Sequence, residues 1–328
     1  MRALLMEGFG EPRAARVGDV PKPEIGPGDV LVRIGAVAIN PVDWKEVAGF
    51  MAPFYPPYPP LWVPGFDGSG VVEAVGAEVS EFAPGEHVLV RPDRLTGNGT
   101  LAEYARVPQD RTAKAPSGLT HAQTASIATA GRTAYQALFR ADVAGLEAGQ
   151  SLLIEGAAGG VGSFAVSFAH AAGIRTAGTC RHANIDYVRG LGADIVIEYE
   201  RADVVAEIRR WLPKGVDAVV DCYSGGHKTE LLDALAPGGR LIVVATLTQD
   251  ADIVSLKASA QKRGLDVRLM LMDYTSLQAD MLAIRRFMDG RRVPLPEIQT
   301  YPLERAAEAL ETVRTGGGRG KVAVRLDQ

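Results

Sequence analysis

The first 120 residues of the chain alternate short apolar runs with breaks rich in proline and glycine. Turn pairs such as Pro27-Gly28 and Pro84-Gly85 precede runs that continue in Val, Leu and Ile, which is typical of β-strands. The runs are "ALLMEGFG", "DVLVRIGAVAIN", "GSGVVEAVG", "EHVLVRP" and "LAEYARVP". This pattern predicts a compact β-barrel.

From about residue 121 the apolar spacing becomes helical, and strands and helices then alternate. Strands such as "SLLIEG" and "VDAVVDCY" are apolar throughout, so both faces of their sheet must be covered, as in a doubly wound parallel sheet. From residue 290 the chain returns to strands, and we expect the last one, "GKVAVRL", to complete the first domain. The predicted α/β fold has a barrel domain over 1–120 and 290–328, and a doubly wound parallel-sheet domain over 121–289.

Composition and charge narrow the class of protein. The 328 residues are 47% hydrophobic with a formal net charge of -4, which suits large cores and lacks the basic excess of a nucleic-acid-binding protein. Cys180 and Cys222 are too few for a disulfide framework or a Cys-rich metal site, and they fit a reducing, cytoplasmic location. We find no apolar stretch of signal or membrane-spanning length, so we expect neither export nor a membrane partner.

The stretch "LLIEGAAGGVGSFAVSFA" places a glycine-rich break between an apolar strand and an apolar helix. We expect the strand to end at Glu155 and the helix to begin near Gly160 or Val161. In that order, free backbone N–H groups and the positive end of the helix dipole point at one place, which suits a pyrophosphate. The alternative is a tight turn in a packed sheet.

The spacing within this break matches the dinucleotide fingerprint. Ala157, Gly159 and Gly162 fill its three slots, with Gly159 where the backbone meets phosphate and Gly162 where the helix packs on the strand. The residues expected to contact the cofactor here are Ala158, Gly159, Gly160, Val161 and Gly162.

The position about 20 residues further on indicates which nucleotide binds. An NAD site places Asp or Glu there, whereas "AGTCRHANIDY" offers no carboxylate at the strand end and supplies Arg181. A planar guanidinium suits a 2′-phosphate, so the sequence favours NADPH over NADH. The alternative for Arg181 is a solvated loop charge.

Several motifs together resemble the medium-chain dehydrogenase/reductases, specifically the zinc-free quinone oxidoreductase (zeta-crystallin-like) and enone reductase branch. They are "NPVDWK", "VPGFDGSGVV", "PGEHV", "GRTAYQAL", "GAAGGVG", "LGAD", "LAPGGRLIVV" and "GKVAV". The resemblance implies a GroES-like β-barrel catalytic domain followed by a Rossmann domain. It also implies a homodimer paired through the apolar strand "LDVRLMLMD" at 265–273, with a tetramer left open.

The zinc enzymes of this superfamily bind a catalytic metal through Cys, His and Cys side chains. The resemblance places Asn40, Phe66 and Thr129 at those positions, and none of these replaces a thiolate or an imidazole. No metal site is therefore expected. Without a metal to lower a hydroxyl pKa, reduction of an activated double bond is favoured over alcohol oxidation.

The catalytic candidates follow from the "NPVDWK" motif. The amide of Asn40 is expected to donate to a substrate carbonyl, the alternative being a turn cap before Pro41. Lys45 stands where many quinone reductases have tyrosine, and its ammonium is expected to stabilise a developing enolate or to deliver a proton. The alternative for Lys45 is a surface lysine paired with Asp43 or Glu46.

The resemblance assigns further residues to the cofactor and the substrate. The additional cofactor candidates are Thr133, Tyr199, Val244, Ala245 and Thr246, and the substrate-pocket candidates are Trp44, Phe50 and Trp62. The aromatic residues of the proline cluster at 53–64 are read either as a rim for a flat substrate or as rings that pack on the barrel. The five histidines show no ligand spacing.

The sequence thus predicts a zinc-independent, NADPH-dependent oxidoreductase. Hydride would pass to a quinone or to the conjugated double bond of an α,β-unsaturated carbonyl, and the partner would be a small electrophile. The alternative is a nucleotide-binding regulatory or structural protein of the same fold without turnover. The physiological substrate is not readable from the sequence.

Overall fold

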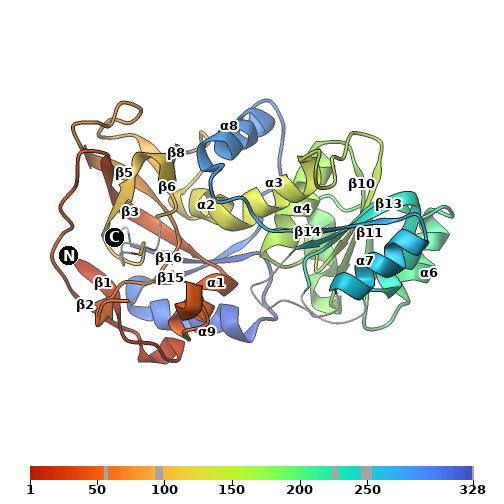
Figure 1. The fold of residues 1–328 in the computed structure, drawn as a ribbon, viewed down its shortest axis with the longest axis horizontal. Coiled ribbons are helices and arrows are strands. Elements are labelled where there is room, and N and C mark those ends of the chain that lie inside the picture. Colours follow the sequence, from red (N-terminus) through yellow and green to blue (C-terminus); the bar gives the residue numbers. More distant parts are fainter. Residues whose placement is uncertain (55–57, 93–98, 224–227, 245–252, 327–328) are drawn as a thin grey trace. The chain divides into compact units, whose positions relative to one another are not determined.

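The chain divides into two compact units in the computed structural model, which describes residues 1–54, 58–92, 99–223, 228–244 and 253–326 (Figure 1). Unit 1 comprises Met1–Thr129, Asp273–Asp289 and Glu297–Gln328, and unit 2 comprises Ala130–Met272 and Gly290–Pro296. Relative to the boundaries expected from the sequence, residues 121–129 and 273–289 group with the barrel unit, and residues 290–296 group with unit 2.

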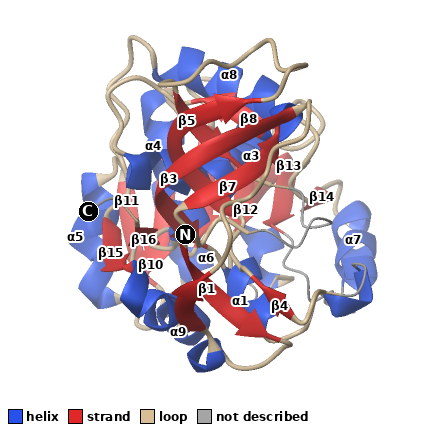
Figure 2. Cartoon of the chain, turned by 90° about the vertical axis from the view of Figure 1, so that its left-hand side faces the viewer, coloured by secondary structure: helices blue, strands red, loops and turns tan. Residues whose placement is uncertain are grey.

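Unit 1 is built on a seven-stranded sheet with the order β15-β16-β3-β5-β6-β8, with β7 also paired to β3 (Figure 2). Its strands are β3 (Asp29–Ile39), β5 (Asp67–Val75), β6 (His87–Val90), β7 (Tyr104–Pro108), β8 (Thr112–Lys114), β15 (Ile298–Pro302) and β16 (Lys321–Arg325). A smaller sheet joins β1 (Arg2–Glu7), β2 (Arg16–Asp19) and β4 (Leu61–Trp62). The strand β16 runs antiparallel to β3, which confirms that the last strand completes this unit.

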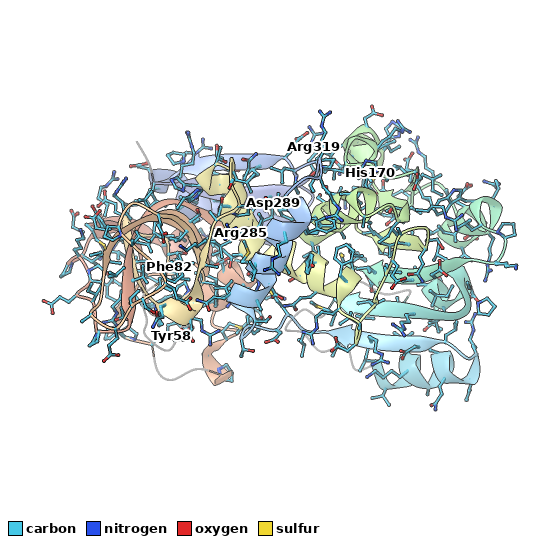
Figure 3. All side chains as sticks on the ribbon, turned by 90° about the horizontal axis from the view of Figure 1, so that it is seen from above. Tyr58, Phe82, His170, Arg285, Asp289 and Arg319 are labelled. Atoms are coloured by element: carbon cyan, nitrogen blue, oxygen red, sulfur yellow. The ribbon has the colours of Figure 1, made fainter. Side chains whose placement is uncertain are left out.

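The helices of unit 1 pack on these strands through apolar stripes. They are α1 (Pro41–Val47), α2 (His121–Ser126), α8 (Leu277–Met288) and α9 (Ala306–Thr315). In α9, Ala306, Ala309 and Leu310 recur at helical spacing, and all three are fully buried in the core of the unit. A surface pocket of unit 1 is lined by residues that include Phe82 and Arg285 (Figure 3), and no residue predicted for the site lines it.

Unit 2 contains a six-stranded sheet with the order β11-β10-β9-β12-β13-β14, in which every neighbouring pair is parallel. The strands are β9 (Ser151–Glu155), β10 (Arg175–Cys180), β11 (Ile195–Glu198), β12 (Val216–Asp221), β13 (Leu235–Val244) and β14 (Asp266–Met270). The helices are α3 (Arg132–Phe139), α4 (Gly160–Ala171), α5 (Ile185–Gly190), α6 (Val204–Trp211) and α7 (Ile253–Lys262). This is the doubly wound parallel sheet predicted from the sequence.

One connection of unit 2 differs from the expected alternation of strands and helices. The segment "TELLDALAPGG" forms only a five-residue 3-10 helix, Glu230–Ala234, and β13 begins directly after it. Three of these residues, Leu231, Leu232 and Ala234, are buried, and one tight turn is enough to bury them. Among the described residues, no helix has the length and apolar character needed to cross a membrane.

Candidate functional site

The glycine-rich break forms the strand, turn and helix start that the sequence predicted. The strand β9 ends at Glu155, α4 begins at Gly160, and Gly159 is its N-cap. A Cβ at Gly162 would lie 2.2 Å from the carbonyl oxygen of Gly156, so only glycine permits the close packing of helix on strand. A Cβ at Gly159 would meet only that same oxygen, at 3.4 Å, which leaves open space beside the helix N-terminus. The geometry fits a bound pyrophosphate.

Arg181 and Tyr199 come together at the carboxyl ends of β10 and β11. The Arg181 Nε donates to the Tyr199 hydroxyl at 3.1 Å, and this contact is the main reason that the pKa of Arg181 is raised. The structure also places a carboxylate next to Arg181 that was not expected from the sequence. It belongs to Glu200, which lies 3.6 Å from the Arg181 Nε. A 2′-phosphate would therefore compete with Glu200 for the guanidinium.

The other cofactor candidates lie on two elements of unit 2. Thr133 is on α3 and is 6% exposed, and Val244 ends β13 at the carboxyl edge of the sheet. Ala245 and Thr246 lie outside the described residues.

Two carboxyl groups lie side by side where the glycine-rich loop leaves the sheet. Glu155 and Asp221 are register partners at the ends of β9 and β12. The Glu155 Oε1 is buried and accepts no hydrogen bond within the described part of the chain. Burial, followed by the charge of Asp221, raises the pKa of Glu155 to about 7.

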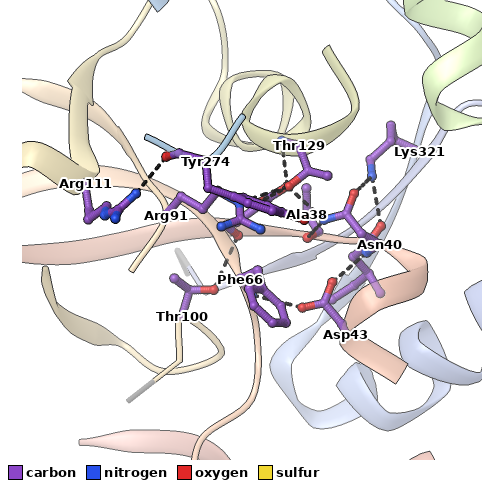
Figure 4. Close-up of polar contacts among 12 residues, drawn as sticks. Ala38, Asn40, Asp43, Phe66, Arg91, Thr100, Arg111, Thr129, Tyr274 and Lys321 are labelled. Carbon is purple, nitrogen blue, oxygen red and sulfur yellow. Dashed lines mark hydrogen bonds and ion pairs between the residues drawn. The ribbon is translucent and has the colours of Figure 1, made fainter. Parts of the chain in front are cut away.

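In unit 1, Asp67 is the centre of a buried polar network, and its partners Asn40, Thr129 and Arg91 are labelled in Figure 4. It is fully buried, and its Oδ2 accepts from the Asn40 Nδ2 at 2.8 Å and from the Thr129 N–H at 3.0 Å. Its Oδ1 accepts from the Thr129 hydroxyl at 2.8 Å and lies 3.6 Å from the Arg91 Nε. Thr129 belongs to a π-helical segment, Ile127–Gly131, of the kind that often marks functional positions.

The side chain of Asn40 is committed to this network, which corrects its expected role as a free donor to substrate. Asn40 is 2% exposed, and its Nδ2 donates to Asp67 and, at 3.3 Å, to the Ala38 carbonyl. Its Oδ1 accepts from the Lys321 Nζ at 2.7 Å, and Lys321 also donates to the Ile39 carbonyl at 2.9 Å. Asn40 therefore orders the start of α1.

Asp43 holds the first turn of α1 in place. It is fully buried, and its carboxylate accepts the N–H of Asn40 at 2.7 Å and the N–H of Phe66 at 2.9 Å. Such bonds at a helix N-terminus stabilise the helix.

Lys45 lies on the last turn of α1 and is not the surface lysine paired with Asp43 or Glu46 that was the alternative for it. It is 9% exposed, and within the described residues its ammonium forms no hydrogen bond or ion pair, whereas Asp43 and Glu46 have other partners. The Nζ lies 5.7 Å from the centre of the Trp44 ring. Burial lowers the pKa of Lys45.

The three substrate-pocket candidates separate into two groups. Trp44 and Phe50 form an edge-to-face pair with centroids 6.0 Å apart, and Phe50 is 54% exposed. Trp62 is only 2% exposed, packs against Tyr58 at 4.8 Å and donates its indole N–H to the Gly8 carbonyl. Trp62 is thus a core residue with a satisfied polar group, and its assignment to a substrate rim is corrected.

The positions that the resemblance relates to a catalytic zinc do not fit a metal. Phe66 offers no side-chain donor, and the Thr129 hydroxyl and the Asn40 amide are bonded to Asp67. No group of three or more His, Cys, Asp or Glu within the described ranges could hold a metal ion.

Three polar residues of these sites were not singled out from the sequence. Lys321 is the first residue of β16, and Arg91 directly follows β6. A charge at a strand end is usually solvated, so no local pattern marks either residue as buried. Glu155 was read only as the end of a strand.

A histidine pair lies elsewhere in unit 1. The His87 Nε2 is 2.9 Å from the His121 Nδ1 and 2.8 Å from the Ser69 hydroxyl. Burial, followed by the charge of His121, lowers the pKa of His87 to about 4.

Comparisons with known proteins agree with this architecture. A family described as "Alcohol dehydrogenase GroES-like domain" matches residues 26–117, and one described as "Zinc-binding dehydrogenase" matches residues 191–324. The human protein named quinone oxidoreductase is 31% identical over 337 residues, which cover 99% of this chain and 98% of the relative. The trans-enoyl reductase pgmF of Aspergillus terreus is 31% identical over 329 residues, covering 93% of this chain and 88% of the relative.

Solved structures extend the likeness and differ in the cofactor they name. A structure described as an NAD-dependent alcohol dehydrogenase superposes with a TM-score of 0.87 at 30% identity, covering 99% of this chain and 100% of that one. A mycobacterial protein complexed with NADPH superposes with a TM-score of 0.82 at 25% identity, with coverage of 99% and 100%. The chain belongs to the medium-chain dehydrogenase/reductase superfamily, in its quinone oxidoreductase branch.

Proposed function

We propose that this protein is a zinc-independent, NADPH-dependent reductase of conjugated carbonyl compounds, with quinones as the near alternative. The observation that carries the proposal is Lys45, whose side chain is largely buried and whose ammonium has no ionic partner among the described residues. A cation held in such surroundings without a counter-charge is expected where negative charge must be stabilised. The relatives named as quinone oxidoreductase and trans-enoyl reductase support the same class of reaction.

Each group has a defined task in this proposal. The N-terminus of α4 and the loop at Gly159 hold the pyrophosphate, and Arg181 with Tyr199 holds the 2′-phosphate. Bound NADPH supplies the hydride. Lys45 stabilises the negative charge that develops on the acceptor oxygen, while Asn40 and Asp43 fix the helix that bears Lys45.

The test is NADPH oxidation at 340 nm with an unsaturated ketone and an ortho-quinone side by side, and NADH as control. Lys45→Met is expected to lower kcat for the ketone by about 100-fold, as for loss of one charge-stabilising donor, and Lys45→Arg is expected to retain part of it. Quinone turnover that is indifferent to both substitutions would move the function to quinone reduction. NADPH binding without any turnover would favour a regulatory or structural role.

The pH profile provides a second test of Lys45. Because burial lowers the pKa of Lys45, its charge is lost below the ordinary lysine value, so ketone reduction should fall as pH rises through that lowered pKa. In Lys45→Arg the guanidinium stays charged, and the fall should disappear. An unchanged alkaline limb in this variant would show that another group controls it.

The glycine loop can be tested with a matched pair. Gly159→Ala should leave the fold intact and raise the KM for NADPH, because its Cβ occupies the space beside the helix N-terminus. Gly162→Ala should instead destabilise unit 2, because its Cβ collides with the backbone at Gly156. Equal effects on stability would argue against this division of roles.

We also propose that the chain forms a homodimer through β14, the edge strand of the unit 2 sheet. Leu269 on β14 is 42% exposed, and Leu271, directly after the strand, is 63% exposed, which is unusual for apolar residues at a sheet edge. Sedimentation of the wild type and of Leu271→Lys tests this: loss of a dimer in the variant supports it, and a monomeric wild type refutes it. A cytoplasmic location remains a prediction.

A further inference from the structure

Arg91 is a buried arginine with only one of its three nitrogens engaged. It is 9% exposed, its Nε donates to the Thr129 hydroxyl at 3.3 Å, and the same nitrogen lies 3.6 Å from the Asp67 Oδ1. Within the part of the chain that the structure describes, no hydrogen bond or ion pair involves its two terminal amino groups. Neither amino group is among the fully buried polar atoms that lack a partner in the described residues, so both remain open to solvent and to a ligand.

Aromatic rings on either side of the Arg91 guanidinium fix its orientation. Its central carbon lies 4.3 Å from the centre of the Tyr274 ring and 5.2 Å from that of Phe66, and Figure 4 shows it between the two. Arg111 reinforces the arrangement, since its guanidinium donates to the Tyr274 carbonyl at 2.7 Å and its own carbonyl accepts the N–H of Arg91 at 3.0 Å. The free amino groups are therefore preorganised.

The charge of Asp67 does not require those amino groups. Asp67 already accepts hydrogen bonds from the Asn40 amide and from the hydroxyl and N–H of Thr129. The terminal amino groups of Arg91 thus remain available as two parallel donors on a fixed cation. Such a fork matches the two oxygens of a carboxylate, and rings on both sides favour a planar group over a tetrahedral phosphate.

We propose that the terminal amino groups of Arg91 bind a carboxylate of the acceptor, so that the substrate class is conjugated carbonyl compounds that carry a carboxylate. This inference rests on the proposed function and adds its specificity. Arg91 is then a substrate-binding residue, separate from Lys45, and no bond is made or broken at it.

The test compares two acceptors with the same conjugated ketone, 4-oxopent-2-enoate and its methyl ester. Their kcat/KM ratio is measured for the wild type, Arg91→Met and Arg91→Lys, so that the intrinsic reactivity of each acceptor cancels between proteins. Arg91→Met should lower the acid-to-ester ratio by tenfold or more, as for a lost bond to a charged group, and Arg91→Lys should lower it less. A ratio unchanged in both variants would overturn the proposal.

Binding without turnover separates this inference from the proposed function. Calorimetry with the saturated keto acid, 4-oxopentanoate, and its methyl ester is performed on NADP-loaded wild type and variants. Preferential binding of the acid that is lost in Arg91→Met supports the carboxylate site even if neither acceptor is reduced. Equal binding of acid and ester by the wild type refutes it. If Arg91→Met does not fold, as judged by thermal unfolding, the comparison of Arg91→Lys with the wild type decides.

Discussion

The two units differ in the surroundings of their buried carboxyl groups. In unit 1, Asp43 and Asp67 are fully buried, yet each accepts hydrogen bonds at both oxygens, and Arg91 and Lys321 bring positive charge to the same network. In unit 2, Glu155 lies beside Asp221, and its pKa is raised to about 7.

The difference shows that burial alone does not decide the environment of a carboxyl group. The donors around Asp67 satisfy both of its oxygens, whereas burial and a second acid beside Glu155 raise the pKa of Glu155. Unit 1 therefore depends on keeping its charges together. Unit 2 holds a proton that it can lose near neutral pH.

The largest expected effect tests this dependence in unit 1. Asp67→Asn leaves the buried Arg91 without its counter-charge and sets an amide donor against Thr129 or Asn40, so we expect a loss of about 3–5 kcal/mol in the free energy of unfolding. The comparison variant is Asp221→Asn, which removes a charge next to Glu155 but also the carboxylate that lies 3.9 Å from Lys228, so the two effects offset each other and the loss should be smaller than for Asp67→Asn. Urea unfolding at pH 7 measures the stability of both variants. Equal losses of unfolding free energy would contradict the difference between the two units.

A smaller effect is expected at Glu155 and should depend on pH. Its pKa is about 7 in the folded chain and near 4.5 when unfolded, so the wild type loses stability as pH rises from 4.5 through 7, on the order of 3 kcal/mol. Glu155→Gln cannot ionise. The variant should match the wild type in pH dependence below pH 4.5 and exceed its stability above pH 7, as measured by urea unfolding at pH 4.5 and pH 8. A difference that is independent of pH would contradict this account.

The smallest expected effect is at His87 in unit 1. There, stability changes with pH in the direction opposite to that expected for Glu155. The pKa of His87 falls to about 4 in the folded chain from 6.5, so the wild type loses stability as pH falls between these values. His87 is partly exposed, so about 1–2 kcal/mol is involved. His87→Gln should lessen the decline between pH 7 and pH 4.5 in the same unfolding assay. A wild-type-like decline would assign the acid sensitivity to another group.

The sequence predicted the elements of both units better than it predicted the polar contacts. Strand ends such as Glu155 and the helix start at Gly160 follow from local patterns of apolar residues and glycine. The environment of Asn40 does not, because its partner Lys321 is 281 positions away along the chain. Trp62 was misassigned for a related reason, since an aromatic residue near prolines gives no local sign of whether its ring faces solvent or a core.

The pairing of β16 with β3 has a consequence for synthesis of the chain. Unit 1 consists of segments that flank all of residues 130–272, and its Lys321 contact is supplied by a strand translated after unit 2. During translation the continuous stretch of unit 2 can fold as it emerges from the ribosome. The end of β3 that pairs with β16 lacks this partner until β16 has been synthesised. Nascent chains should therefore acquire protease resistance in unit 2 first, and the buried charges of unit 1 should become ordered last.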